Sequence, residues 1–250
     1  MAFHQLFFPD HLDASTRTQS SIAVLASGGV ESAVLTLALA AQFEWVKPLY
    51  VRFGLRWEEA ELQCLRRFLS ATAHPRIAAL TVLDLPITDL LSGHWSITGD
   101  GVPDDTTADE AVYIPGRNIL FISKAAVWCA INRVRFLAHG SLSTNPFPDA
   151  TEAFFSAAEE AAGLAMAQPL SLLRPFSRMH KKDVLDLGRN MPLELTFSCI
   201  APVRVPAYPE FVQCGRCNKC HERRVAFMEA GLSDRTTYAT IAGARELVLK

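Results

Sequence analysis

Long hydrophobic segments are absent from this sequence of 250 residues, although 50% of its residues are hydrophobic. No apolar run reaches the roughly 18 to 20 residues that a transmembrane helix needs. The N-terminus, MAFHQLFFPDHLD, also lacks the basic region and the following apolar region of a secretory signal. These two absences predict a cytoplasmic protein with no membrane partner.

An excess of positive charge is missing as well. The chain has 24 Lys and Arg against 26 Asp and Glu, which gives a formal net charge of -2. Proteins that hold nucleic acid by its phosphates present a basic surface, so no strong nucleic-acid-binding surface is expected. The length is ample for burying a hydrophobic core. The composition therefore predicts an ordinary globular protein that acts on small molecules.

Cysteine is scarce, but the few cysteines are clustered. The chain has six, and four of them fall within 22 residues: Cys199, Cys214, Cys217 and Cys220. In a reducing compartment such clustering favours a metal over disulfides. Four thiolates with this C-x-x-C spacing suit a tetrahedral zinc ion, and a site closed by four cysteines is structural. An iron–sulfur cluster is the alternative.

Apolar stretches of strand length alternate with stretches of helical periodicity along most of the chain. This alternation predicts an α/β fold with a doubly wound parallel sheet and helices on both faces. Ligands bind such sheets at the carboxyl ends of the strands. The expected strands are 21–26, 45–53, 79–85, 134–138 and 170–173, and the expected helices are 31–42, 56–73, 118–132, 150–166 and 181–189.

The pattern also divides the chain into three parts. Residues 1–20 are an N-terminal extension, 21–195 the α/β nucleotide-binding domain, and 196–250 a C-terminal zinc-binding and helical segment packed as one unit with that domain. Within the domain, residues 92–112 are rich in Gly, Asp and Thr and are expected to form a long mobile loop. Loops of this length are often lids or binding loops, and plain disorder is the alternative.

A glycine-rich turn follows the first expected strand. It lies where a strand turns into a helix, whose first N–H groups attract anions. The turn lacks the Gly-Lys-Ser/Thr end of a Walker loop, which excludes the usual kinase or GTPase motif. Taken alone, so short a motif is more often an ordinary glycine turn. Its residues are Ser27, Gly28, Gly29, Val30, Glu31 and Ser32.

This turn resembles the Ser-Gly-Gly-x-Asp-Ser loop of the ATP-pyrophosphatase (PP-loop) superfamily, whose fold is similar to that of the adenine nucleotide alpha hydrolases. Members of the superfamily bind ATP, adenylate a substrate oxygen and release pyrophosphate. Glu31 stands here where the superfamily pattern has Asp. Its carboxylate can still meet a phosphate-bound Mg²⁺, because such ions are usually held by one or two carboxylates.

Further motifs follow in order along the chain. They are Pro115-Gly116-Arg117-Asn118, Arg174-Pro175-Phe176 followed by Lys181, and the cysteine cluster with its trailing Arg223. With them, the sequence resembles the 7-cyano-7-deazaguanine synthase family of queuosine biosynthesis from about Ser21 to Phe227. Phe53-Gly54-Leu55-Arg56 is a partial match to the Tyr-Gly-Gln-Arg of that family. Together, five ordered motifs are far more specific than any one of them.

The resemblance implies an ATP-dependent C–N ligase that uses Mg²⁺ and contains Zn²⁺. That family adenylates the carboxylate of 7-carboxy-7-deazaguanine, forms an amide with ammonia, and uses a second ATP to form the nitrile. The implied catalytic residues are Glu31, Lys181 and Arg117. The implied ATP-binding residues are Ser27, Gly28, Gly29, Val30, Glu31, Ser32, Arg56, Gly116, Arg117, Asn118 and Lys181, with Asn118 as the cap of its helix.

The segment expected to hold the heterocycle departs from the family pattern. After Gly140 the family has a glutamate, an aspartate and Tyr-Pro-Asp, whereas this chain has Ser143, Asn145 and Phe147-Pro148-Asp149. Neutral groups accept hydrogen bonds from a guanine-like edge less strongly than carboxylates do, so base recognition is expected to differ. Phe147 can stack on a planar ring. The implied substrate-binding residues are Phe53, Gly140, Ser143, Asn145, Phe147 and Asp149.

Alternatives share parts of this pattern. With an altered pocket, the activated deazaguanine carboxylate can be joined to another amine, including one on a macromolecule, and the long interval 201–213 can cover the pocket or meet a protein partner. tRNA thiolases share the loop, but only Cys64 and Cys129 are spare for catalysis. Amidating synthetases share it too. A non-catalytic nucleotide-binding module is the alternative outside enzymes. The resemblance also implies a homodimer.

Overall fold

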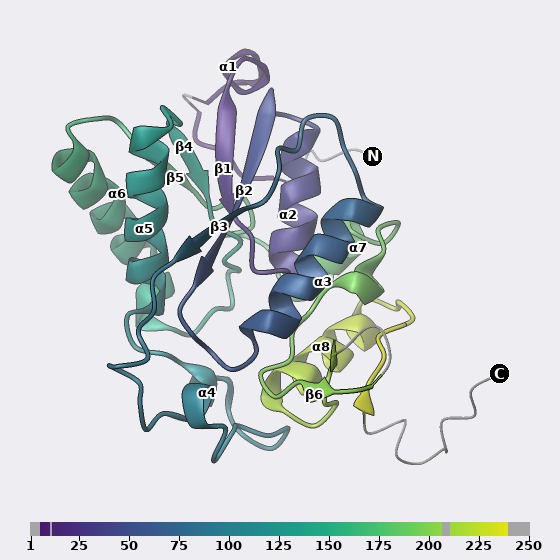
Figure 1. The fold of residues 1–250 in the computed structure, drawn as a ribbon. Coiled ribbons are helices and arrows are strands. Elements are labelled where there is room, and N and C mark those ends of the chain that lie inside the picture. Colours follow the sequence, from purple (N-terminus) through teal and green to yellow (C-terminus); the bar gives the residue numbers. More distant parts are fainter. Residues whose placement is uncertain (1–5, 11, 207–210, 240–250) are drawn as a thin grey trace.

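Five parallel strands form the central sheet of the computed structural model, which describes residues 6–10, 12–206 and 211–239 (Figure 1). The strands are β1 (Ser21–Leu25), β2 (Trp45–Arg52), β3 (Thr81–Asp84), β4 (Phe136–Ala138) and β5 (Ser171–Leu173). Their order is β3-β2-β1-β4-β5, so the direction of winding reverses between β1 and β4. This order confirms the doubly wound α/β fold that the sequence predicts.

Helices cover both faces of the sheet. Helices α2 (Val30–Ala40), α3 (Glu58–Ala71) and α7 (Lys181–Leu187) lie on one face, and α5 (Arg117–Ile131) and α6 (Glu152–Met166) on the other (Figure 1). A single turn, η2 (Pro148–Ala150), precedes α6. Within the described part of the chain, no helix combines the length and the apolarity needed to cross a bilayer.

The side chains of β1 explain why helices are needed on both faces. Successive residues of a strand point to opposite sides of the sheet. Ile22 and Val24 belong to a buried cluster that includes Val34 of α2, whereas Ala23 and Leu25 belong to the cluster that includes Ile122 of α5. The apolar run from Ile22 to Leu25 is therefore buried on both sides of the sheet, as a run of consecutive hydrophobic residues predicts.

The described residues before β1 and after β5 also pack on this α/β unit. The N-terminal extension contains α1 (Ala14–Thr18), and its Leu6 and Leu12 are buried in the cluster that contains α2. At the other end come η3 (Leu193–Leu195), a two-stranded antiparallel sheet of β6 (Val203–Arg204) and β7 (Phe211–Val212), and α8 (Asn218–Glu229). Residues 207–210 of the expected insert and 240–250 of the expected C-terminal segment lie outside the described residues.

The expected loop between β3 and α5 contains two short helical elements, α4 (Trp95–Thr98) and η1 (Asp109–Val112). Its middle is docked on the start of α8. Asp104 forms a backbone bridge to Cys217. The backbone N–H of Asn218 donates to the Pro103 carbonyl at 3.0 Å, and its side-chain amide donates to the Thr107 carbonyl at 2.9 Å. The loop and the cysteine segment, far apart in sequence, therefore form one layer.

The start of α5 corrects the expected role of Asn118. Gly116 is the N-cap, with a φ of 70°, and the helix begins at Arg117. The Asp149 carboxylate accepts the backbone N–H of Asn118 at 3.0 Å, and the Asn118 side chain donates to the Asp149 carbonyl at 2.9 Å. A carboxylate at this position satisfies a free helix N–H and complements the helix dipole. Asp149, and not Asn118, therefore caps this helix.

Arg223 of α8 is fully buried, with 0% of its side chain exposed. Its guanidinium donates to the Thr196 hydroxyl and the Leu193 carbonyl, both at 2.8 Å, and to the Thr236 hydroxyl at 2.9 Å. A carboxylate oxygen of Asp234 lies 3.8 Å from the Nε atom. A buried charge is tolerated when it is paired and hydrogen-bonded. Arg223 therefore joins α8 to η3 and to the segment that follows α8.

Arg223→Met is expected to lower the free energy of unfolding by about 3 kcal/mol, because it removes the cation beside the Asp234 carboxylate and the buried donor to three oxygens. In a chain of this size, this corresponds to a fall in Tm of roughly 6–12 °C, measurable by circular dichroism. Arg224→Met is the matched control, since Arg224 is 39% exposed and its 4.0 Å pair with Asp105 is worth less than about 1 kcal/mol. Equal losses in the two variants would contradict the prediction.

Candidate functional site

A cavity of about 1170 Å³ opens at the carboxyl ends of β1 and β4. The strand order reverses between these two strands, which is where open α/β sheets bind ligands. The turn after β1, the segment after β4, and residues of α7, α8 and the long loop before α5 line it. Pockets for small molecules usually measure about 300–1,000 Å³, so this cavity lies at the large end of that range.

The turn between β1 and α2 is held in shape by its own serines. The Ser32 hydroxyl accepts the Gly28 N–H at 3.1 Å, and the Ser27 hydroxyl accepts the Gly29 N–H at 3.2 Å. Gly28 has a φ of 85°, and a Cβ there would lie 3.1 Å from the Glu61 carbonyl oxygen, so the position requires glycine. Gly29 is the N-cap of α2, whose first turn lines the cavity. Such a helix start is suited to binding phosphate.

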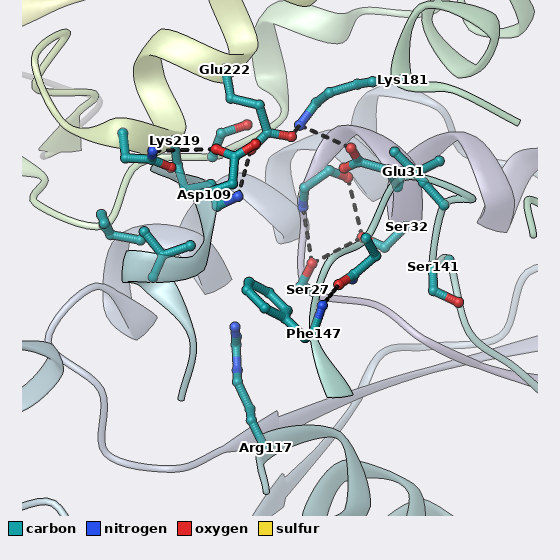
Figure 2. Close-up of a pocket in the computed structure, with 18 of the residues that line it drawn as sticks. Ser27, Glu31, Ser32, Asp109, Arg117, Ser141, Phe147, Lys181, Lys219 and Glu222 are labelled. Carbon is teal, nitrogen blue, oxygen red and sulfur yellow. Dashed lines mark hydrogen bonds and ion pairs between the residues drawn. The ribbon is translucent and has the colours of Figure 1, made fainter. Parts of the chain in front are cut away.

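Lys181, the first residue of α7, lies between two carboxylates beside this turn (Figure 2). Its Nζ is 3.0 Å from Glu31 Oε1 and 2.7 Å from Glu222 Oε1. Burial opposes the positive charge, but Glu31 and Glu222 together raise the pKa of the Lys181 amine above its usual value. Lys181 is therefore cationic at neutral pH.

Glu222 contacts a second cation, Lys219, on its own helix. The Glu222 Oε2 atom accepts a hydrogen bond from Lys219 Nζ at 2.6 Å. Burial acts to raise the pKa of Glu222, but Lys181 and Lys219 outweigh it and lower this pKa to about 2. The end of the cavity beside the turn after β1, here called the phosphate end, thus contains a chain of ion pairs that joins Glu31, Lys181, Glu222 and Lys219.

Aromatic rings and a guanidinium lie at the other end of the cavity. In Figure 2, Arg117 and Lys181 lie on opposite sides of Ser27 and Phe147. The ring centroids of Tyr113 and Phe147 are 5.2 Å apart. Among the described residues, the buried Nε of Arg117 has no hydrogen-bond partner. An aromatic pair beside a guanidinium suits a planar ligand that bears negative charge.

Two buried polar atoms at the end of β4 also line the cavity without a partner. They are His139 Nδ1 and Ser141 Oγ, for which the described part of the chain offers no hydrogen bond. Burial, and then the charges of Arg117 and Arg174, lower the pKa of His139 to about 4. The ring is therefore neutral at pH 7. Buried polar atoms normally have partners, so these two atoms are candidates for ligand contact.

Glu61 lines the cavity under the phosphate turn. The Tyr50 hydroxyl donates to its Oε2 atom at 2.7 Å. Burial raises the pKa of Glu61 to about 7, against the opposing charge of Arg117. Glu58, one turn earlier on α3, accepts the backbone N–H groups of Phe53 and Gly54 at 2.5 and 2.9 Å. Because its pKa is raised to about 7, Glu61 is a carboxyl group in the cavity that gains or loses its proton near neutral pH.

Most of the residues proposed from the resemblance line this one cavity. They come from the turn after β1, the start of α5, the segment after β4 and the start of α7. The residues in the lining are Ser27, Gly29, Glu31, Ser32, Arg117, Asn118, Gly140, Asn145, Phe147, Asp149 and Lys181.

Six of the proposed residues are not in the lining. Gly28 and Gly116 shape the turns before α2 and α5, and Val30, the first residue of α2, is buried in the core. The other three have contacts of their own. Arg56 is exposed beside Gly99, Phe53 is fully buried and stacks on Phe121 at 4.5 Å, and the Ser143 hydroxyl donates to the Met179 carbonyl at 2.9 Å.

Other lining residues are not predicted by the sequence motifs. His139 and Ser141 directly follow β4, so the rule that ligands bind at carboxyl ends of strands could have identified them. Lys219 and Glu222 fall at positions that the C-x-x-C-x-x-C-x-x-Arg pattern leaves unspecified, and no sequence signal marks them. The described residues of the insert 201–213 are not in the lining.

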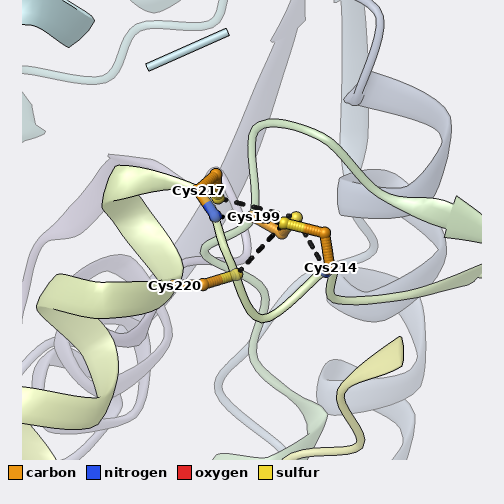
Figure 3. A group of neighbouring side chains, drawn as sticks. All are labelled: Cys199, Cys214, Cys217 and Cys220. Atoms are coloured by element: carbon orange, nitrogen blue, oxygen red, sulfur yellow. Dashed lines mark hydrogen bonds between the residues drawn. The ribbon is translucent and has the colours of Figure 1, made fainter. Parts of the chain in front are cut away.

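The four clustered cysteines lie together and are buried (Figure 3). Their sulfurs are all within 4.8 Å of one another. Backbone N–H groups donate to these sulfurs, from Cys214 to Cys199 Sγ at 3.2 Å and from Cys217 to Cys214 Sγ at 3.3 Å. Four close sulfurs with N–H donors fit a metal ion that prefers tetrahedral thiolate ligands and leave no position open for a substrate. The site is therefore suited to a structural metal.

Comparison with known proteins identifies the family of this chain. The family model described as "Queuosine biosynthesis protein QueC" matches residues 21–231. The chain is 29% identical over 242 residues to the 7-cyano-7-deazaguanine synthase of Solidesulfovibrio magneticus, covering 90% of this chain and 98% of that protein. It is 30% identical to the synthase of Syntrophobacter fumaroxidans, covering 86% and 94%. This chain belongs to the QueC family of queuosine biosynthesis proteins.

Proposed function

We propose that this protein is an ATP-dependent C–N ligase that activates the carboxylate of 7-carboxy-7-deazaguanine, or of a closely related heterocycle, for attack by ammonia. The observation that carries the proposal is a single cavity whose two ends are lined by different kinds of side chain. One end has a helix start and the cation of Lys181, which suit phosphates. The other has the rings of Tyr113 and Phe147 beside Arg117, which suit a planar, anionic heterocycle.

The proposed reaction has two rounds. In the first, a carboxylate oxygen of the substrate attacks the α-phosphorus of ATP and pyrophosphate leaves. Ammonia then attacks the acyl carbon and loses one proton, the bond to AMP breaks, and the product is the amide. In the second, the amide oxygen attacks another ATP, pyrophosphate leaves again, and loss of two protons and of AMP yields the nitrile. No protein nucleophile is needed, so the protein contributes mainly positioning and charge stabilisation.

The residues of the cavity have distinct proposed tasks in this reaction. The N–H groups at the start of α2 hold phosphate oxygens, and Lys181 stabilises the pyrophosphate as it leaves. Arg117 provides positive charge beside the aromatic pair, where the anionic heterocycle is proposed to bind. Mg²⁺, when bound with ATP, neutralises phosphate charge, and Glu31 is the carboxylate of the turn that would hold it. Zn²⁺ would be held by the four cysteines and would stabilise the fold.

The base is proposed to be recognised at the end of β4. The neutral His139 and Ser141 offer unpartnered hydrogen-bonding atoms there, next to Gly140, whose Cβ position would be 3.5 Å from Glu31. These atoms therefore lie close to the phosphate turn, where the reacting carboxylate must come. Ser143, by contrast, uses its hydroxyl on Met179.

The experiment is a turnover assay with ATP, Mg²⁺, ammonium and 7-carboxy-7-deazaguanine. We expect AMP and pyrophosphate to form only when the carboxylate is present, and mass spectrometry to identify the amide or the nitrile. A deazaguanine without the carboxylate is the control substrate. A product that carries a larger amine would identify the enzyme as a conjugating member of the family. Failure of the protein to bind ATP in the presence of Mg²⁺ would overturn the proposal.

A further inference from the structure

We propose that Glu222 is a positioning residue that holds the Lys181 ammonium at the phosphate end of the cavity and so makes nucleotide binding depend on the helix that follows the cysteine cluster. The inference rests on the proposed ATP-dependent function, in which Lys181 meets the phosphates. Glu222 lies outside the phosphate turn and outside the cysteine ligands.

Three helices meet at the Lys181 ammonium. Lys181 begins α7, Glu31 lies in the first turn of α2, and Glu222 lies in the second turn of α8. The two carboxylate contacts, at 3.0 and 2.7 Å, are both within hydrogen-bonding distance of the same nitrogen. Figure 2 shows the lysine reaching between the two glutamates. The side chain is thus held from both sides.

Glu222 is the better fixed of the two carboxylates. Its second oxygen accepts from Lys219 on the same helix, three residues earlier, whereas no second cation is within ion-pair distance of Glu31 among the described residues. The side chains of Lys181, Glu31 and Glu222 are only 14%, 22% and 27% exposed. Charges that are shielded from water interact more strongly than surface charges do, so this contact has more influence than an exposed ion pair.

The cysteine cluster determines where Glu222 lies. Cys217 is the N-cap of α8, and Cys220 lies in its first turn. Glu222 follows two residues later, and Arg223 anchors the opposite side of the same turn in the core. The cysteine cluster therefore fixes the end of α8 from which Glu222 reaches Lys181, and a bound metal would hold it there.

Loss of the Glu222 charge is expected to weaken binding of MgATP. With a neutral residue at 222, the only remaining carboxylate at the Lys181 ammonium in the described structure is Glu31. Lys181 is then held from one side only, so its ammonium is no longer fixed at the place where the phosphates bind. Glu222→Gln should raise KM for MgATP about tenfold and change kcat by less than about threefold, since binding rather than chemistry is affected.

A second measurement needs neither nucleotide nor turnover. The acylation rate of Lys181 by an amine-specific reagent, mapped by mass spectrometry, should rise severalfold in Glu222→Gln, because a carboxylate that favours the protonated amine is removed. Glu222→Asp, which retains the charge, should recover part of both effects. Glu160→Gln, an exposed charge change on α6 away from the cavity, should behave as the wild type.

These measurements separate a positioning role for Glu222 from a purely structural one. Glu222→Gln with unchanged KM and unchanged Lys181 acylation would overturn the inference. So would loss of the bound metal or a large fall in Tm in this variant, because the residue would then be structural. Failure of the wild type to bind MgATP would overturn the proposed function instead, and the acylation rates would still decide whether Glu222 holds Lys181.

Discussion

Lys181→Met is expected to lower kcat/KM for conversion of ATP to AMP by about 100- to 1,000-fold, the usual loss when one preorganised donor to a charged transition state is removed. One reason is the loss of the cation, and the other is the two carboxylates that remain beside it. Glu31 and Glu222, now without their shared partner at 3.0 and 2.7 Å, would face the triphosphate with uncompensated negative charge. The loss should exceed that of an ordinary phosphate contact.

Steady-state assays of AMP release, with tryptophan fluorescence or circular dichroism as the test of folding, measure this effect. Lys181→Arg retains the charge but not the point-like ammonium, so it should lie between the wild type and Lys181→Met. Lys124→Met is the control for removal of a lysine outside the cavity lining. If Lys181→Met retained kcat/KM within about threefold of the wild type, Lys181 would have no catalytic role.

Cys217→Ser should abolish metal retention and the ordered packing of the C-terminal segment. Structural zinc contributes an apparent free energy of roughly 10–16 kcal/mol in small domains, whereas whole domains are stable by only about 5–15 kcal/mol. Loss of even part of this contribution is therefore expected to unfold residues 196–239 at 37 °C. Because α8 begins at Cys217, the cavity wall formed by that helix should be lost with it.

Metal analysis of the purified protein and thermal unfolding with and without a chelator test this prediction. The wild type should contain one zinc per chain and lose stability in the chelator, whereas Cys217→Ser should contain none. Cys64→Ala is the control, since Cys64 is a buried core residue outside the cluster and should leave the zinc in place. Iron with visible absorption in the wild type would replace the zinc assignment by an iron–sulfur cluster.

The sequence predicts the fold and the phosphate turn because both depend on local signals. Apolar runs of strand length, helical periodicity and the Ser-Gly-Gly turn are each contained within a few residues. The position of the turn after β1 and the parallel strand order follow from them. The four cysteines are predicted to form one site for the same reason, since they lie close together along the sequence.

The rest of the site depends on contacts between distant segments. The motif predicts that Asn118 caps its helix, but the cap comes from Asp149, 31 residues later. Lys219 and Glu222 become neighbours of Lys181 only when α8 packs near α7, and no spacing rule describes that. The same motif-based reasoning places Ser143 against the substrate, although its hydroxyl is directed to Met179. His139 and Ser141, earlier in that segment, line the cavity instead.

The docking of the long loop on the start of α8 has a consequence for biosynthesis. All five strands of the sheet are complete by Leu173, so a chain emerging from the ribosome has its whole sheet while α8 is still unmade. Pro103 and Thr107 cannot gain their partner until Asn218 has been added. The cavity wall formed by this loop is consequently completed only after the start of α8 has been synthesised, and a nascent chain contains its phosphate turn long before it has a closed pocket.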